Sequence, residues 1–306
     1  MITRYPKQIV ALGAAALLFV AACGGSATTN PGGGSTPGAS AAASASAAAV
    51  TCVAGTITAS GSTALQPLVD AAGKAYVAAC PGSAVSVQGG GSGTGLTQVL
   101  QGTVQIGDSD VTAESKLATP DAATLVDHVV ARQGWIMVTH TDVTGVTNLT
   151  TQQATDIWTG KITNWKDVGG PDMPIVLILR PSSSGTRTTF RNIVLGGAAE
   201  ANSGTTLTED SNGAVTTAVQ NTPGSTSVIG FAYYAANKAG LNGLQLDGVD
   251  ATVANMTSGT YKLQAFGHMY TKGDPTGLTK AFLDYMLSPA VQSGLIPSLF
   301  YAPANS

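Results

Sequence analysis

Three clusters of serine, threonine and glycine each lie where an apolar stretch passes into a helical pattern. They are Gly61-Ser62-Thr63, Gly89 to Gly95 and Ser182 to Thr186. A helix N-terminus offers unsatisfied backbone N–H groups and the positive end of the helix dipole, and small hydroxyl residues add O–H donors. Arg180 comes just before the third cluster and supplies a charged, planar fork of donors. Together the clusters indicate one tetrahedral anion that is bound from several sides.

Each cluster also has an ordinary explanation. Ser182 to Thr186 fits a capped helix beside a surface arginine, and Gly89 to Gly95 fits a flexible loop in which Ser92 is only a helix cap. The first cluster, with Pro67 early in the following helix, is equally ambiguous when taken alone.

Asp110 is a negative charge close to the predicted anion site. A carboxylate there makes sense if the anion carries a proton, because an ionised aspartate only accepts hydrogen bonds. Hydrogen phosphate has a proton to donate, whereas sulfate has none. The alternative is a solvated aspartate in a turn.

The elements that must position these residues alternate between strands and helices. Such alternation predicts an α/β architecture with largely parallel sheets. The expected strands are residues 53–59, 84–88, 104–107, one or two within 125–138, 175–179 and 228–234. The expected helices are residues 65–76, a stretch from 96, 151–159, a stretch after 186, 278–286 and 289–295.

The first 22 residues are expected to be a signal peptide. Arg4 and Lys7 precede an apolar run, and residues 20–23 resemble the lipobox of bacterial lipoproteins. The resemblance implies cleavage before Cys23 and lipidation of its thiol, the alternative being ordinary secretion with a free Cys23. Residues 23–51 then form a tether rich in glycine, serine and alanine, with a span of about 30 Å.

The remaining cysteines, Cys52 and Cys80, form an even pair in an oxidising compartment. We expect a disulfide, with two separate buried thiols as the alternative.

The mature chain is acidic. Without Arg4 and Lys7, the sequence has 12 basic and 17 acidic residues, which gives a net charge of about −5. This charge argues against nucleic acid and means that local donors must hold any anion.

Catalysis and metal binding receive little support. His128, His140 and His268 are scattered and lack metal-ligand spacing, and no serine has an evident partner for nucleophilic catalysis. We therefore predict no enzyme activity, no metal and no cofactor. A secreted phosphatase would need a nucleophile or metal cluster that the sequence does not show.

Several segments together resemble the periplasmic phosphate-binding proteins of ABC-type phosphate importers. The resemblance covers nearly all of residues 53–306. Its segments, in order, read ITASGSTALQP, QGGGSGTGLTQVLQGTVQIGDSD, IWTGKITNWKDV, RPSSSGTRTTF, VIGFAYY and FLDYMLSPAVQ. It implies a two-lobed periplasmic-binding-protein fold (Venus flytrap, type II) with phosphate in the cleft between the lobes.

The resemblance also implies roles for single residues. Phosphate would be bound by eight residues, and Arg180 would also pair with Asp110. The eight are Thr63, Ala64 through its N–H, Ser92, Asp110 as proton acceptor, Arg180, Ser184, Gly185 and Thr186.

The lobes expected from this fold are residues 53–134 with 267–306, and residues 135–266, hinged near Gly134 and Phe266. The expected function is delivery of phosphate to ABC permease subunits by a monomer lipid-anchored at the outer face of the cytoplasmic membrane. The alternative on the same fold is another oxyanion, sulfate or molybdate, against which Asp110 argues.

Overall fold

The computed structural model describes residues 50–202 and 206–305. The predicted signal peptide, the lipidated Cys23 and the tether up to residue 49 lie outside the described residues. From Val50 onward the described chain belongs to one compact unit. None of the helices in the described ranges is long and apolar enough to cross a membrane.

Helices and strands alternate along the chain, as the sequence predicts. The strands are β1 (Gly55–Gly61), β2 (Ser83–Gln88), β3 (Ile106–Ser109), β4 (Leu125–His140), β5 (Asn148–Leu149), β6 (Val176–Leu179), β7 (Leu207–Thr208), β8 (Ser225–Gly230), β9 (Leu241–Leu246), β10 (Gln264–Lys272) and β11 (Ala302–Pro303). The α-helices are α1 (Gln66–Ala79), α2 (Ser92–Gln101), α3 (Thr119–Ala122), α4 (Thr151–Trp158), α5 (Gly185–Ile193), α6 (Asn212–Asn221), α7 (Phe231–Ala236), α8 (Val253–Thr257), α9 (Gly277–Met286) and α10 (Ile296–Ser298). Short helical turns are η1 (Ala113–Ser115), η2 (Trp165–Val168) and η3 (Ala290–Leu295).

The sheets are mixed, so the expectation of largely parallel sheets is wrong in part. Strand β1 pairs in parallel with β2 and β3, and β6 pairs in parallel with β7 and β8. Strand β4 is antiparallel to β10, β8 and β9. Residues 125–138 belong to one strand, and residues 231–234, expected in a strand, begin helix α7.

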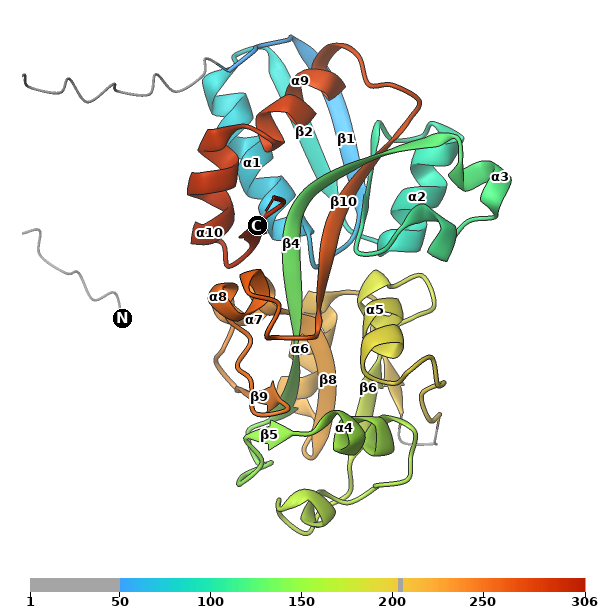
Figure 1. Ribbon diagram of the computed structural model, residues 1–306, viewed down its shortest axis with the longest axis vertical. Coiled ribbons are helices and arrows are strands. Elements are labelled where there is room, and N and C mark those ends of the chain that lie inside the picture. The colour runs from blue at the N-terminus through green and yellow to red at the C-terminus, as the bar shows by residue number, and fades with distance from the viewer. Residues whose placement is uncertain (1–49, 203–205, 306) are drawn as a thin grey trace, which may run out of the picture. The chain divides into compact units, whose positions relative to one another are not determined.

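Two strands connect two hydrophobic cores. The first half of β4 pairs with β10, and its second half pairs with β8 and β9. In Figure 1, β4 and β10 lie side by side, and β4 continues toward β8 and β9. A chain that leaves one core along β4 and returns along β10 must place these strands antiparallel, which explains the mixed sheets. The β4–β10 register shifts between Gly267 and His268.

Core 1 and core 2 are the two large clusters of buried apolar side chains. Core 1 includes Leu68, Tyr76, Ile106, Phe282 and Tyr301. Core 2 draws mainly on residues 135–263 and includes Trp135, Leu149, Trp158, Phe190 and Ile229. It also includes Ala64, from the loop between β1 and α1. We call the elements packed on these clusters the core-1 half and the core-2 half.

Cys52 and Cys80 form the predicted disulfide, which spans 28 residues and joins Cα atoms 5.1 Å apart. It ties the segment before β1 to the C-terminal end of α1 in the core-1 half.

Candidate anion-binding site

Asp110 lies just beyond the C-terminal end of β3 and is 2% exposed. Its Oδ1 accepts hydrogen bonds from the Ser62 hydroxyl and from Gln133 Nε2 at 2.9 Å. Its Oδ2 accepts one from Thr186 Oγ1 at 3.2 Å. A carboxylate offers about four lone-pair positions, so one position on Oδ2 remains for a further donor.

Opposing influences act on the pKa of Asp110. Burial raises the pKa, because it disfavours the charged form. Hydrogen bonds from Ser62 and Gln133, the charge of Arg180 and the hydrogen bond from Thr186 lower it. The net direction is upward, yet the surrounding donors are arranged for a carboxylate.

Arg180 follows β6, in the core-2 half, and is 4% exposed. Its Nε donates to Glu209 O at 3.0 Å, and its Nη2 donates to Asp210 O at 2.9 Å and to Thr63 Oγ1 at 3.3 Å. Its Nη1 is buried and has no hydrogen-bond partner in the part of the chain that the structure describes. A buried guanidinium donor left unpaired is costly, so this nitrogen indicates a place for an acceptor.

The expected direct pairing of Arg180 with Asp110 is wrong for this structure. Within the described residues, no ion pair joins the two side chains. The arginine fork is turned toward backbone carbonyls instead, and its charge acts on Asp110 only through space. Burial lowers the pKa of Arg180, whereas the charges of Asp110 and Asp210 raise it.

Thr63 joins the two halves. Its Oγ1 accepts hydrogen bonds from Arg180, from the backbone N–H of Asn212 at 3.3 Å and from Asn212 Nδ2 at 3.1 Å. Because the oxygen is used as an acceptor, the Thr63 O–H remains available as a donor. Asn212 opens helix α6 and is fully buried.

Helix α5 begins at Gly185, and Ser184 is its N-cap. Ser184 Oγ accepts from the backbone N–H of Arg187 at 3.2 Å. The N–H groups of Gly185 and Thr186 lie in the first turn, where a helix offers them no acceptor of its own. Of the predicted donors, Thr186 contacts Asp110 Oδ2, and Gly185 lies beside it, since a Cβ on this glycine would be 2.8 Å from Oδ2. Ser184 precedes them as the cap of the helix.

Of the two remaining predicted donors, Ser92 keeps its hydroxyl proton for an anion, whereas the N–H of Ala64 is used within the protein. Ser92 is fully buried at the start of α2, and its Oγ accepts from the Asp110 N–H at 2.9 Å, which leaves its O–H as a donor. The Ala64 N–H, expected to bind the anion, donates to Ser62 Oγ at 3.1 Å in this structure. Gly61 permits this turn, because its φ is 142° and a Cβ there would lie 2.1 Å from Asp108 O.

Sequence reasoning missed three side chains of this network, Gln133, Trp135 and Asn212, and it placed Ser62 in the first cluster without its contact to Asp110. Ser62 and Gln133 donate to Asp110, and Trp135 Nε1 donates to Thr186 Oγ1 at 3.0 Å. One signal was present for Asn212. Ser211-Asn212-Gly213 precedes a helix in the same manner as the three clusters, and Ser211 caps that helix.

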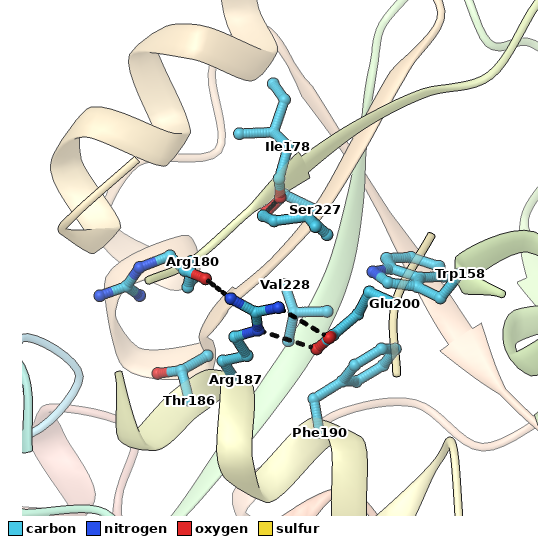
Figure 2. A pocket seen from close by; sticks show the side chains of 10 residues that line it. Trp158, Ile178, Arg180, Thr186, Arg187, Phe190, Glu200, Ser227 and Val228 are labelled. Atoms are coloured by element: carbon cyan, nitrogen blue, oxygen red, sulfur yellow. Dashed lines mark hydrogen bonds and ion pairs between the residues drawn. The ribbon is translucent and has the colours of Figure 1, made fainter. Parts of the chain in front are cut away.

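A second charged network lies behind Arg180. Arg187 donates from Nη1 to Arg180 O at 2.6 Å and from Nη2 to Glu200 Oε2 at 2.9 Å, and Arg191 also pairs with Glu200. Burial raises the pKa of Glu200, but hydrogen bonds from the two arginines outweigh it and the net shift is downward. Figure 2 shows Arg187 between Arg180 and Glu200, in a cavity of about 20 Å³. This cavity has room for about one water and is too small for a tetrahedral anion. The arginine–glutamate network around it supports the Arg180 loop through the Arg187 contact with Arg180 O.

The three histidines lie apart from this network. His268 contacts Asp127, His140 contacts Asp142, and His128 contacts Thr271. In residues 50–202 and 206–305 there is no group of three or more histidine, cysteine, aspartate or glutamate side chains that could hold a metal ion.

Asp108, two residues before Asp110, is fully buried, and neither of its carboxyl oxygens has a partner within the described chain. Burial, and then the charge of Asp110, raise the pKa of Asp108 well above its ordinary value. The folded protein thus keeps this proton at a pH where the unfolded chain has lost it. Stability is therefore lost as the pH rises from the unfolded pKa through the folded one.

We predict that Asp108→Asn, which cannot ionise, stabilises the protein at pH 8, because the wild type loses about 1.4 kcal/mol of stability for each pH unit between the unfolded and the folded pKa of Asp108. The gain should shrink at pH 5. Thermal unfolding of both proteins at the two pH values measures it, with the solvent-accessible Asp70→Asn as control. An equal effect at both pH values would contradict the assignment.

Comparisons with known proteins agree with this arrangement. A family model described as the PBP superfamily domain matches residues 46–290. The phosphate-binding protein PstS of Bacillus subtilis is 43% identical over 252 residues, which cover 82% of this chain and 82% of that protein. The chain belongs to the PstS family of phosphate-binding proteins.

Solved structures resemble this PstS-family chain over nearly their whole length. One, from Clostridium perfringens, is assigned as a phosphate ABC transporter substrate-binding protein with bound phosphate. It has a TM-score of 0.73 and 28% identity, and the match covers 81% of this chain and 99% of that one. An ABC-type phosphate transport receptor from Vibrio cholerae has a TM-score of 0.63 and 29% identity, covering 80% and 99%. The chain therefore has the predicted α/β periplasmic-binding-protein fold of type II.

Proposed function

We propose that this protein binds inorganic phosphate outside the cytoplasm and delivers it to an ABC permease, without chemistry on the ligand. The observation that carries the proposal is the buried Nη1 of Arg180, which has no hydrogen-bond partner among the described residues, near enough to Asp110 for its charge to act on that carboxylate, whose Oδ2 keeps one free acceptor position. An unused N–H donor and an unused carboxylate acceptor in one site suit an anion that can both accept and donate hydrogen bonds. Hydrogen phosphate has both properties.

The remaining contacts are assigned to donors at helix starts and loops. The O–H groups of Thr63, Ser92 and Ser184 and the N–H groups of Gly185 and Thr186 would bind the phosphate oxygens, while Asp110 Oδ2 would accept its proton. Ala64 N–H would join them only by sharing its bond to Ser62 Oγ.

Two lobes are proposed to close over the ligand: residues 53–134 with 267–306, and residues 135–266. The separate cores 1 and 2 support this division. The antiparallel β4–β10 pair would carry the hinge near Gly134 and Phe266, close to the register shift at Gly267. Thr63 and Arg180, from different halves, already contact each other.

The lipid anchor is proposed on Cys23, after removal of residues 1–22, which would place a monomer at the outer face of the cytoplasmic membrane with the permease as partner. Labelling of growing cells with a radioactive fatty acid should mark the wild type and leave Cys23→Ala unlabelled. Label on both proteins would refute the anchor at this residue.

Titration calorimetry tests the proposed ligand directly. Phosphate should bind with a large heat, and sulfate should not compete with it. A chromogenic phosphate ester should remain uncleaved by the same preparation. Absence of phosphate binding in protein freed of bound anion would refute the proposal.

We expect Arg180→Ala to weaken phosphate binding at least about tenfold without unfolding the protein. Charge-assisted hydrogen bonds contribute about 1.5–3 kcal/mol each, and this fork supplies the open donor of the site. Calorimetry gives the affinity, and thermal unfolding checks the fold. Lys161→Ala, which removes a surface cation of the core-2 half paired with Asp156, is the charge-matched control. Unchanged affinity in Arg180→Ala would remove this residue from the site.

A further inference from the structure

Lys116 connects the two halves at a point separate from the proposed phosphate contacts. It follows η1 in the core-1 half and is partly buried. Its Nζ donates to Ser182 O at 2.6 Å, to Ser184 O at 3.3 Å and to Thr188 Oγ1 at 2.6 Å. An ammonium group has three N–H donors, and here three acceptors of the core-2 half match them.

The acceptors belong to the loop and helix that carry the phosphate donors. Ser184 caps α5 through its side chain, while its backbone carbonyl accepts from Lys116 and from Thr188 Oγ1 at 3.1 Å. Lys116 therefore contacts the backbone of the anion-binding loop and stays clear of its donor groups.

A second contact between the halves lies beside Lys116. The backbone N–H of Gly93, in the first turn of α2, donates to Ser183 O at 2.8 Å. Lys116, Gly93 and Ser183 line one side of an open hollow of about 410 Å³. These contacts thus lie at the solvent edge of the cleft, where the halves would have to part for a ligand to leave.

We propose that Lys116 is a positioning residue that latches the closed form and sets how fast phosphate dissociates. This inference rests on the proposed phosphate binding. The three hydrogen bonds exist only when the Ser182–Thr188 segment lies against the core-1 half. An open form would break them before the anion could escape, so they favour the closed state and retain the ligand.

The latch is predicted to act on the dissociation rate. Lys116→Met keeps much of the aliphatic chain and removes the ammonium donors. Phosphate should then leave at least about tenfold faster, which corresponds to about 1.4 kcal/mol. The association rate should change much less, because phosphate enters the open form, in which the latch is not made.

The experiment compares full-length wild type, Lys116→Met and Thr188→Val after removal of bound phosphate. Dissociation is followed in a stopped-flow instrument by mixing each phosphate complex with an excess of an enzymatic phosphate scavenger. Lys74→Met is the matched control, because it removes an exposed lysine, paired with Asp70, at equal change of charge. The double variant Lys116→Met/Thr188→Val measures the coupling, and thermal unfolding without phosphate verifies each fold.

Faster dissociation in Lys116→Met and Thr188→Val, less than additive in the double variant, with Lys74→Met unchanged, supports the latch. Dissociation at the wild-type rate in both single variants overturns it while leaving phosphate binding intact. A slower association with unchanged dissociation also overturns it, because it assigns Lys116 to attraction of the anion. A wild type that binds no phosphate refutes the proposed function and the latch together.

Discussion

Gly185→Ala should weaken phosphate binding at least about a hundredfold while the protein stays folded. A Cβ at this position would lie 2.2 Å from Ser92 Oγ and 2.8 Å from Asp110 Oδ2. Both distances are shorter than any normal contact, so the neighbours must move apart. Ser92 and Asp110 belong to the core-1 half and Gly185 to the core-2 half. The clash is therefore relieved most easily if the halves separate, which dismantles the site but neither core.

Calorimetry with phosphate and thermal unfolding without it measure the two parts of this prediction. Gly294→Ala is the matched control, since that glycine lies in the helical turn η3 and an added Cβ there meets nothing within 4 Å. A large drop in the melting temperature of unliganded Gly185→Ala would show instead that the two halves cannot part.

Many of the strands and helices and the positions of the clusters could be predicted, because both depend on local signals. Apolar runs marked the strands, and small polar residues marked the helix starts. The single strand β4 could not be recognised, because its two ends pair with different partners. Residues 231–234 look like a strand by composition, yet they follow the end of β8 and pack as α7. Strands β9 and β10 and helix α6 were also missed.

Within the site, the residues that could be predicted lie in the clusters or in the segments of the family resemblance. Gln133 and Asn212 lie elsewhere along the chain and reach Asp110 and Thr63 only through the tertiary fold. The expected Arg180–Asp110 ion pair failed for a related reason. The carbonyls of residues 209 and 210, which no sequence pattern marks as acceptors, take up the arginine fork.

The protein should prefer phosphate to sulfate by more than about a hundredfold, and Asp110 should be the cause. Hydrogen phosphate can donate its proton to the open position on Asp110 Oδ2. Sulfate would place an anionic acceptor against a buried carboxylate without a proton between them. Unmet buried acceptors cost about 1–3 kcal/mol, and the repulsion adds to this cost. Asp110→Asn should reduce the ratio of phosphate affinity to sulfate affinity, because the amide can donate an N–H to sulfate.

In the wild type, a lower pH should also reduce the preference for phosphate over sulfate. Burial raises the pKa of Asp110, so its carboxyl gains a proton above the pH at which an exposed aspartate would, and the protonated group can donate to sulfate. Sulfate affinity should therefore rise as the pH falls in the wild type and stay level in Asp110→Asn. Competition titrations at several pH values measure this. Asp70→Asn, which removes an exposed carboxylate of the core-1 half at equal change of charge, is the matched control. If wild type and Asp110→Asn discriminate equally at every pH, selectivity must come from the hydroxyl and N–H donors alone.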